Sequence, residues 1–324
     1  MKMWRPDRGL SGPFTASERD IAQLNRIFSD AFTDRYRRDG MVGVRVPALN
    51  ARIWRYALRD AGEGAMVWRD EDDELVAFNV AHDSGAEGWM GPLAVRPDRQ
   101  GLGVGGAIVR SAIDWLQSQG VTTLGLETMP RTVDNIGFYA RMGFVPGHLT
   151  VTLSGDVTGR QPRERGTRAS RLDSAERATL LARCRDRLEA SAPGYDFTRE
   201  HELTHDLEIG DTIVVEHAGE ITGFALWHSA PLAEARSADE LRVLKFFAGS
   251  PRALVDLVRA VEGCAVTLGI RRVAIRCQSG FGGAFAALIE RGYQVRWTDL
   301  RMTLEGYPEA RLPDGETLFS NWEI

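Results

Sequence analysis

The chain carries the same set of punctuating residues twice, and this repeat limits its possible folds more than any other feature. The matching pairs, each separated by 149 positions, are Gly120 with Gly269, Gly143 with Gly292, and Phe144 with Tyr293. Recurrence over such a length indicates the duplication of a whole domain. A chain of 324 residues with 43% hydrophobic residues is long and apolar enough for two domains with a core each.

Hydrophobic periodicity gives both halves one order of elements: two helices, three strands, then helix, strand, helix, strand. In the first half we expect helices at 17–38, 49–59, 104–119 and 133–142, and strands at 65–68, 75–81, 89–95, 121–127 and 149–153. In the second half we expect helices at 174–190, 198–208, 251–268 and 283–290, and strands at 212–216, 221–227, 241–248, 272–277 and 295–304. The segment around 155–170 is polar and contains several arginines, which is typical of a solvated linker. We therefore predict an α/β protein with domains at 1–155 and 171–324 and a linker at 156–170.

Charge and composition restrict the partners. The formal net charge is −5, so no overall positive field would attract nucleic acid or anionic lipid, and a small-molecule partner is favoured. The N-terminal segment lacks the apolar core of a signal peptide, and no stretch reaches the roughly 18 apolar residues of a membrane span. We expect a cytoplasmic protein, a monomer or homodimer, with Cys184, Cys264 and Cys277 as buried free thiols.

A glycine-rich corner at 100–106, QGLGVGG, separates an expected strand from an expected helix. Glycines let the backbone turn tightly and leave no Cβ in the way, so N–H groups at the start of the helix can point at an anion. A pyrophosphate is the natural ligand. The spacing of Gly101, Gly103 and Gly106 also fits a dinucleotide-binding fingerprint, with Glu127 as the ribose-binding acid, although a Rossmann corner follows its strand directly and opens its domain. A purely structural turn is the third reading.

A second motif proposes a different chemistry. His201-Glu202-Leu203-Thr204-His205 has the HExxH spacing of zinc peptidases, in which two histidines on one helix hold the metal and the glutamate activates water. Here the helix is short, charged residues flank the motif, and no third histidine follows at the usual distance. We expect a polar amphipathic helix with Leu203 and Leu207 inward, both histidines largely solvated, and no metal.

The residues around the glycine corner resemble a known family. The run from Leu93 to Gly106, LAVRPDRQGLGVGG, is similar to the acetyl-CoA-binding signature of the GNAT N-acetyltransferases, and 135–144, NIGFYARMGF, is similar to their second conserved segment. The resemblance covers most of 15–155, and it reaches 170–304 only through the repeat. It implies two tandem GNAT-like domains, each a mixed, mostly antiparallel sheet with a splayed parallel strand pair flanked by helices.

The resemblance also implies a cosubstrate, acetyl-CoA, and no metal. Carried over to this chain, the backbone N–H groups of Leu102, Gly103, Val104, Gly105 and Gly106 hold the pyrophosphate, Gln100 and Gly101 shape the turn, and the backbone of Leu93 and Val95 holds the pantetheine. The family often has an asparagine seven residues before its tyrosine. This chain has Thr132 there and Asn135 only four residues before Tyr139, which we include as a candidate contact.

Direct attack of an amine on a thioester requires a neutral amine and a proton for the leaving thiolate. By the resemblance Tyr139 is the acid, because a phenol beside the sulfur can donate that proton; a tyrosine that only packs in the core is the alternative. Glu87 is the candidate base, with Asp83 and Glu127 as rivals, and Asp83 and Glu87 are also placed to attract a cationic amine.

Subtracting the repeat spacing shows that the second half has lost these groups. The counterparts of Gln100, Gly103, Gly105 and Tyr139 are, in that order, Gly249, Arg252, Leu254 and Leu288. We therefore expect a degenerate second domain and an acetyl-CoA-dependent N-acetyltransferase of a small-molecule primary amine. A non-catalytic acyl-CoA-binding sensor or scaffold is the alternative, and a nucleotide-dependent oxidoreductase and a zinc peptidase are less favoured.

Overall fold

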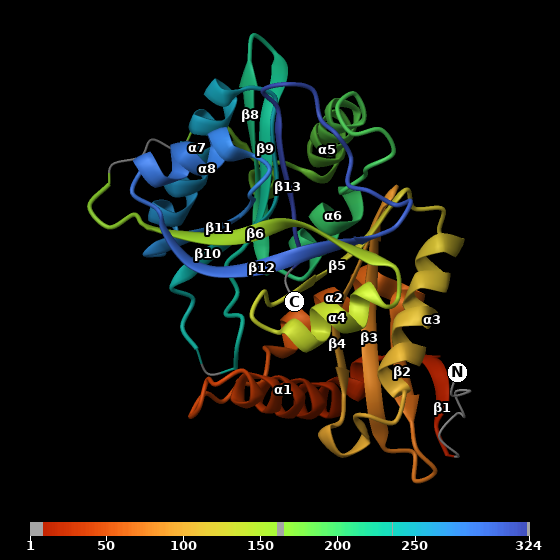
Figure 1. The fold of residues 1–324 in the computed structure, drawn as a ribbon. Helices are drawn as coiled ribbons and strands as arrows, with labels where there is room; N and C mark the ends of the chain where they lie inside the picture. Colours follow the sequence, from red (N-terminus) through yellow and green to blue (C-terminus); the bar gives the residue numbers. More distant parts are fainter. Residues whose placement is uncertain (1–8, 161–164, 235, 323–324) are drawn as a thin grey trace.

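The computed structural model describes residues 9–160, 165–234 and 236–322, which form one twisted sheet with helices on both faces (Figure 1). The strands of the first half are β1 Ser11–Thr15, β2 Ala65–Arg69, β3 Leu75–Ser84, β4 Glu87–Val95, β5 Thr123–Thr128 and β6 Phe144–Asp156. Those of the second are β7 Thr167–Arg168, β8 Gly210–His217, β9 Glu220–His228, β10 Glu240–Ala248, β11 Arg272–Gln278, β12 Gln294–Leu304 and β13 Thr317–Ser320. The α-helices are α1 Ile21–Arg38, α2 Ala51–Ala61, α3 Val104–Ser118, α4 Val133–Ala140, α5 Ser174–Glu189, α6 Thr198–Asp206, α7 Pro251–Thr267 and α8 Gly282–Glu290.

In the first half, alternate residues of β3 serve two cores, as the period of a strand requires. Phe78 and Val80 pack under α1 and α2 together with Trp54. On the opposite face, Ala77 packs beneath α3 with Ile108. Both faces of the sheet are therefore covered, which explains why β3 is buried along nearly its whole length.

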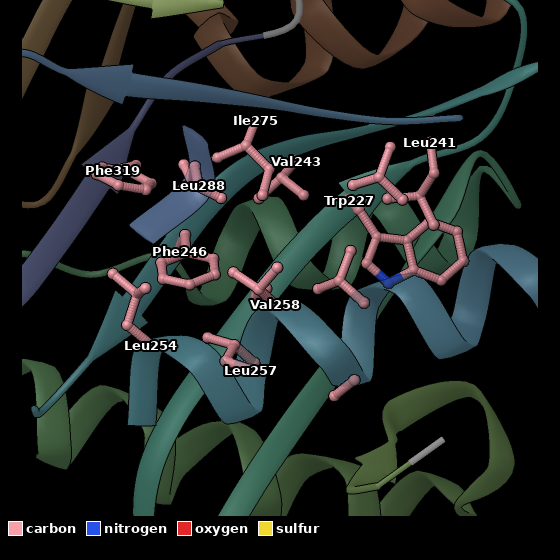
Figure 2. Packing of buried hydrophobic residues seen from close by; sticks show 14 of the residues in the cluster. Trp227, Leu241, Val243, Phe246, Leu254, Leu257, Val258, Ile275, Leu288 and Phe319 are labelled. Atoms are coloured by element: carbon pink, nitrogen blue, oxygen red, sulfur yellow. The ribbon is translucent and has the colours of Figure 1, made fainter. Parts of the chain in front are cut away.

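The second half repeats this arrangement around α7. Leu254, Leu257 and Val258 of α7 pack against strand residues such as Phe246 and Ile275, and Leu288 of α8 joins the same cluster (Figure 2). The other face of the sheet is covered by α5, whose Leu180 and Leu188 lie in a separate cluster. The mixed sheet, the helices on both faces and the tandem arrangement confirm the predicted fold class.

The two halves exchange their long strands. β12 of the second half lies between β5 and β6 of the first, and β6 lies between β12 and β11 (Figure 1). Thr150 is paired directly with Asp299, which is its equivalent in the 149-residue repeat. The two halves are therefore related by a local two-fold axis that passes between these residues. The sequence suggested a separate sheet for each half. Instead, the outer strand of each half's parallel pair is hydrogen-bonded to the last long strand of the other half. An edge strand left unpaired would expose its N–H and C=O groups.

Several local expectations are corrected. The linker contains Arg160 and Arg168, but these side chains are held by the buried carboxylates of Glu262 and Asp211, both at 2.7 Å, and are not simply solvated. Residues 161–164 of the linker, and residues 1–8 of the predicted leaderless N-terminus, lie outside the described residues. The short strands β1, β7 and β13 were not predicted.

Cys184, Cys264 and Cys277 are buried thiols outside any disulfide, as predicted. Across the described ranges, no helix is both long enough and apolar enough to cross a membrane.

Candidate active site

The glycine corner turns directly into α3. Gly101 and Gly103 have φ angles of +79° and +87°, which residues with a Cβ rarely adopt, and the Gln100 side chain donates a hydrogen bond to Val95 O at 3.0 Å. The first N–H groups of a helix have no partner within that helix. In α3 one of them, Gly106 N, donates a hydrogen bond to Gly103 O at 3.1 Å. A Cβ on Gly105 would lie 3.6 Å from Phe138, so the corner has room for a ligand to approach the backbone but little room for a large side chain.

The strand before the corner separates from its parallel neighbour. β4 pairs with β5 only from Glu87 with Thr123 to Met90 with Leu126, and a bulge at Gly91-Pro92 then bends β4 away while its pairing with β3 continues to Val95. Among the described strands, none pairs with the β5-facing edge of β4 beyond Met90. The predicted splayed pair is therefore present.

A cavity of about 320 Å³ occupies the place where these strands part. The predicted site residues that line it are Leu93, Val95, Gln100, Asn135 and Tyr139. The glycines and Leu102 are not in its wall; they lie at the start of α3, next to Gln100. The structure thus brings the strand residues, the turn and the two residues of α4 to one site.

Tyr139 lies deep in this site and is 6% exposed. Its ring contacts Phe138 and Phe144 edge-on, with centroids 5.1 and 6.1 Å away, and burial raises its pKa well above the ordinary value for a phenol. The hydroxyl therefore keeps its proton at neutral pH and is a potential donor to a group bound in the cavity. Asn135 lies one turn earlier on α4 and is partly exposed.

A second cavity of about 290 Å³ adjoins the first and shares with it Phe32, Tyr36, the 90–92 segment, Glu127 and Asp299. Its remaining wall comes from both halves of the chain: Phe28, Val46, Leu49, His82 and Trp89 from the first, and Leu232, Arg276, Arg301, Asn321 and Trp322 from the second. Sequence reasoning missed all of these residues, because none belongs to a motif and the second set is brought here by the strand exchange.

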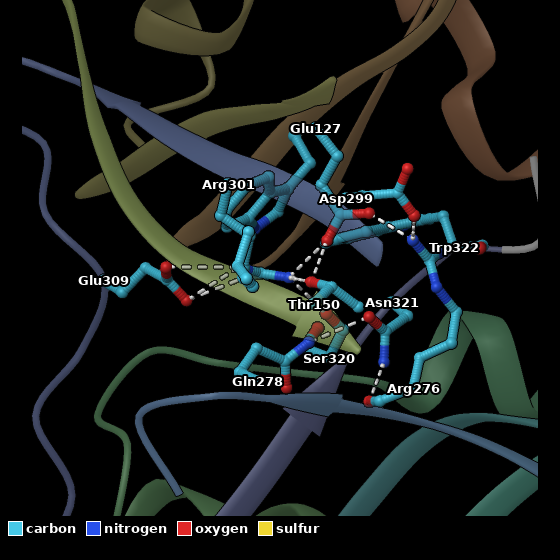
Figure 3. A network of polar contacts seen from close by, with 12 residues as sticks. Glu127, Thr150, Arg276, Gln278, Asp299, Arg301, Glu309, Ser320, Asn321 and Trp322 are labelled. Carbon is cyan, nitrogen blue, oxygen red and sulfur yellow. Dashed lines mark hydrogen bonds and ion pairs between the residues drawn. The ribbon is translucent and has the colours of Figure 1, made fainter. Parts of the chain in front are cut away.

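A network of charged and polar side chains surrounds Glu127 and Asp299 (Figure 3), and these two residues line both cavities. Glu127 accepts hydrogen bonds from Thr150 at 2.5 Å and Arg301 at 2.9 Å, and it also pairs with Arg276, its own counterpart in the repeat. Burial raises the pKa of Glu127, but the two arginines outweigh it and hold that pKa below its ordinary value. Asp299 accepts from Arg276 at 3.1 Å, yet burial keeps its pKa raised. Opposite charges at repeat-equivalent positions, Glu127 and Arg276, were the sequence signal that could have revealed this network.

Glu87 and Asp83 are placed differently from the cavities. Glu87 is 2% exposed, and its two oxygens accept hydrogen bonds from Trp89 Nε1 at 2.8 Å and Ser320 Oγ at 2.6 Å. Neither Glu87 nor Asp83 is among the residues that line either cavity. Asp83 contacts Arg199 at 3.3 Å. Of the three carboxylates considered, only Glu127 borders both cavities.

The HExxH segment forms α6 and faces the interior in an unexpected way. His201 is 5% exposed, its Nδ1 lies 2.6 Å from Thr212 Oγ1, and burial lowers its pKa to about 3, so the ring is neutral. The expectation that both histidines are solvated is wrong for His201, although Leu203 and Leu207 do pack inward. Within the described ranges no group of three or more His, Cys, Asp and Glu side chains is arranged to hold a metal ion.

In the second half, the place equivalent to the first cavity is filled by protein. β10 and β11 are paired from Glu240 with Arg272 to Val243 with Ile275 and then part, as β4 and β5 do. The C-terminal strand β13 pairs with the next part of β10, from Lys245 with Ser320 to Ala248 with Thr317. Leu254 and Leu288, which replace Gly105 and Tyr139, are 4% and 1% exposed in the core.

A glycine-rich helix start beside a splayed parallel strand pair defines an α/β protein that can bind a phosphate-bearing cosubstrate along a sheet edge. Residues 22–144 match the sequence model of the Acetyltransferase (GNAT) family.

Two curated relatives that match part of the chain are N-acetyltransferases by name. The ribosomal protein bS18-alanine N-acetyltransferase of Salmonella typhimurium is 34% identical over 73 residues, which is 22% of this chain and 49% of that one. The uncharacterized N-acetyltransferase ycf52 of Pyropia yezoensis is 30% identical over 78 residues, 24% of this chain and 43% of the other. The chain thus spans less than half the length of these two curated relatives.

The whole architecture recurs in solved structures. A GCN5-related N-acetyltransferase from Sphaerobacter thermophilus is similar over 95% of this chain and 98% of its own, with a TM-score of 0.59 at 18% identity. A tandem GNAT protein from the clavulanic acid biosynthesis pathway is similar over 93% of this chain and 100% of its own, with a TM-score of 0.57 at 13% identity. At these identities the likeness shows the fold, and the tandem GNAT fold is confirmed for this chain.

Proposed function

We propose that this protein transfers the acetyl group of acetyl-CoA to the primary amine of a small molecule, and that the first half carries the reaction. The observation that supports this most directly is the cavity at the parting of β4 and β5, which runs from Gln100 at the glycine corner to Tyr139. A pantetheine arm has the length and the amide groups to lie along the free edge of β4, as an added strand would.

In this proposal the pyrophosphate lies at the start of α3, held by backbone N–H groups from Leu102 to Gly106 and by the dipole of that helix. The turn is supported by Gly101 and Gln100. The backbone of Leu93 and Val95 holds the pantetheine, and Asn135 is a polar neighbour on α4. These roles require backbone groups and small side chains more than charge.

The reaction is direct. The amine nitrogen attacks the thioester carbonyl carbon, a C–N bond forms, and the C–S bond breaks with its electron pair on sulfur. Tyr139 donates the proton that the thiolate needs, and the proton lost from the attacking nitrogen restores the phenol. Glu87 stays a predicted base, but it lines neither cavity and its oxygens accept hydrogen bonds from Trp89 and Ser320, so a proton would have to reach it through a hydroxyl such as that of Ser320.

The acceptor binds in the second cavity, because that cavity meets the first at residues 90–92, beside the place where the strands part. We infer a small-molecule amine that reaches the thioester from this side. The predictions of a cytoplasmic monomer or homodimer, with no nucleic-acid or membrane partner, belong to the same proposal.

The test is binding followed by turnover. Isothermal titration with acetyl-CoA should give one site per chain, while NADH, NADPH, FAD and Zn²⁺ should give no comparable heat. Release of free CoA should then be followed with a panel of benzylamine, tryptamine, glucosamine, spermidine and an alanine-initiated peptide. Binding of acetyl-CoA without acetylation of any amine would favour the sensor, and binding of a dinucleotide alone would overturn the proposal.

A further inference from the structure

A buried histidine in the wall of the second cavity has one ring nitrogen fixed and the other free. His82 of β3 is 1% exposed, and its Nδ1 lies 2.8 Å from Asp60 Oδ2, a fully buried carboxylate at the end of α2. Its Nε2 has no hydrogen-bond partner, although buried polar atoms usually have one. The ring forms part of the wall of the second cavity.

The state of Asp60 decides which nitrogen of His82 carries the proton. Burial raises the pKa of Asp60, but His82 and Arg199, whose Nε lies 3.0 Å from Asp60 Oδ1, outweigh it and hold that pKa below the ordinary value. An ionised carboxylate can only accept hydrogen bonds, so Nδ1 of the neutral ring is the donor. The lone pair of the ring is therefore on Nε2.

The second half of the chain encloses this pair. Trp322 stacks on the His82 ring with centroids 5.9 Å apart, and Lys245 Nζ lies 3.5 Å from the centre of the Trp322 ring. Glu200 accepts a hydrogen bond from Ser84 and lies 3.6 Å from Lys245. The charged groups around the pair are thus Arg199 and Glu200 of α6, Lys245 of β10 and Asp83 of β3. The α6 segment that resembled a zinc motif contributes two of them.

His82 is also close in the sheet to the splayed strands. It is paired with Trp89 of β4, the residue before Met90, where the pairing of β4 with β5 ends. Met90, Gly91 and Pro92 line both cavities, and His82 lines the second. A molecule in the second cavity can therefore lie between this ring and the thioester bound in the first.

We propose that His82 is the general base that deprotonates the acceptor amine, with Asp60 as the residue that fixes its tautomer and orientation. This inference rests on the proposed function. His82 Nε2 takes one proton from the ammonium form of the acceptor, which leaves the neutral amine that attacks the thioester. The imidazolium is stabilised by Asp60 and returns its proton to solvent. Tyr139 and His82 then approach the reacting centre from the first and second cavity respectively.

The experiment compares the release of CoA by the wild type, His82→Gln, His82→Ala and Asp60→Asn across pH 5.5 to 9. The acceptor is the best amine of the panel above, and acetyl-CoA alone serves as a second reaction in which water is the acceptor. His205→Gln is the matched control, because His205 is on α6 and lines neither cavity. Calorimetry with acetyl-CoA reports whether each variant is folded with its first cavity intact.

His82→Gln should lower kcat at least about 100-fold and leave the Kd for acetyl-CoA within about twofold, since loss of a general base costs 10²–10⁴-fold in rate. The fall in rate of the wild type at low pH should disappear in His82→Gln. Added imidazole should restore part of the rate of His82→Ala, which a purely structural role for the ring would not allow. Asp60→Asn should lower kcat without changing KM, because the amide favours the wrong tautomer.

Activity of His82→Gln within about threefold of the wild type, with an unchanged pH profile, would overturn the base assignment and leave the proposed function standing. If a variant fails to bind acetyl-CoA, nuclear magnetic resonance of the wild-type protein tests the proposal instead. The ¹⁵N signals of the His82 ring should then show a protonated Nδ1 and an unprotonated Nε2, and a protonated Nε2 at neutral pH overturns the proposal. Wild-type protein that neither binds nor turns over acetyl-CoA overturns the function and this inference together.

Discussion

The two halves of the chain have the same arrangement of strands, but they differ in what lies at the open edge of their parallel strand pair. In each, a pair of parallel strands is joined at one end and parts at the other, β4 from β5 and β10 from β11. In the second half the chain's own strand β13 pairs with the free edge of β10. In the first half a cavity remains at the equivalent place.

This difference teaches what a splayed strand pair requires. Free N–H and C=O groups at a parting inside the protein need a partner, because an unpaired buried polar group is costly. A strand of the same chain meets that need permanently, and a ligand with amide groups meets it only when it binds. The side chains differ in the same way. Leu254 and Leu288 fill the core of the second half, whereas in the first half Gly105 leaves the backbone accessible and Tyr139 carries a hydroxyl that can donate a proton.

The first prediction concerns the proton donor. Tyr139→Phe should lower kcat by about 10²–10⁴-fold, the usual contribution of a general acid, because the ring is kept and the hydroxyl is lost. The Kd for acetyl-CoA, measured by calorimetry, should change less than about threefold. Equal turnover in the variant would remove Tyr139 from the mechanism, whereas a parallel loss of affinity would make it a packing residue.

The second prediction copies the second half into the first. Gly105→Leu should weaken acetyl-CoA binding at least about 100-fold, since a side chain there would displace the pyrophosphate from two or more N–H groups worth about 1.5–3 kcal/mol each. The melting temperature without ligand checks the fold. Gly283→Ala, at the start of α8 with no neighbour within 4 Å of its Cβ position, serves as a glycine control away from the corner. Retained affinity in Gly105→Leu would show that the phosphate binds elsewhere.

A third prediction addresses the strand that fills the second half. Phe319 of β13 is 1% exposed and stacks on Phe246 with ring centroids 5.2 Å apart. Phe319→Ala should therefore lower the free energy of unfolding by about 3–5 kcal/mol, the cost of a large cavity in a core. Leu93→Ala in the first half, at the open edge of β4, should cost less stability and more acetyl-CoA affinity. Urea unfolding and calorimetry of both variants compare the halves, and equal stability losses would contradict this contrast between them.

The smallest expected effect concerns the buried carboxyl group of Glu200 in the second half. Burial raises the pKa of Glu200 to about 7, above its ordinary value. The folded state then binds more protons than the unfolded state between the two pKa values, so Glu200 contributes stability at low pH that is lost as the pH rises toward 7. This loss should be on the order of 1–3 kcal/mol between pH 5 and 8, and Glu200→Gln should flatten it. An equally steep loss in that variant would place its origin elsewhere.

Much of the fold could be predicted from local patterns. The periodicity of 17–38 and the glycines before 104 located α1 and α3, and the 149-residue spacing identified the repeat that the pairing of Thr150 with Asp299 now confirms. β13 escaped prediction because four residues have no distinctive period, and its partner is fixed only by the free edge of β10.

The glycine corner and the second cavity differ in the same respect. A corner built from backbone groups depends on closely spaced glycines, so the sequence by itself determined it, together with the loss of its counterpart in the second half. His82, Asp60, Arg276 and Trp322 are separated by tens to hundreds of positions and share no motif. Only the tertiary structure decided their meeting, because the exchange of β6 and β12 and the return of β13 bring both halves to one cavity, and contacts of that kind depend on the pairing of strand edges and not on local sequence.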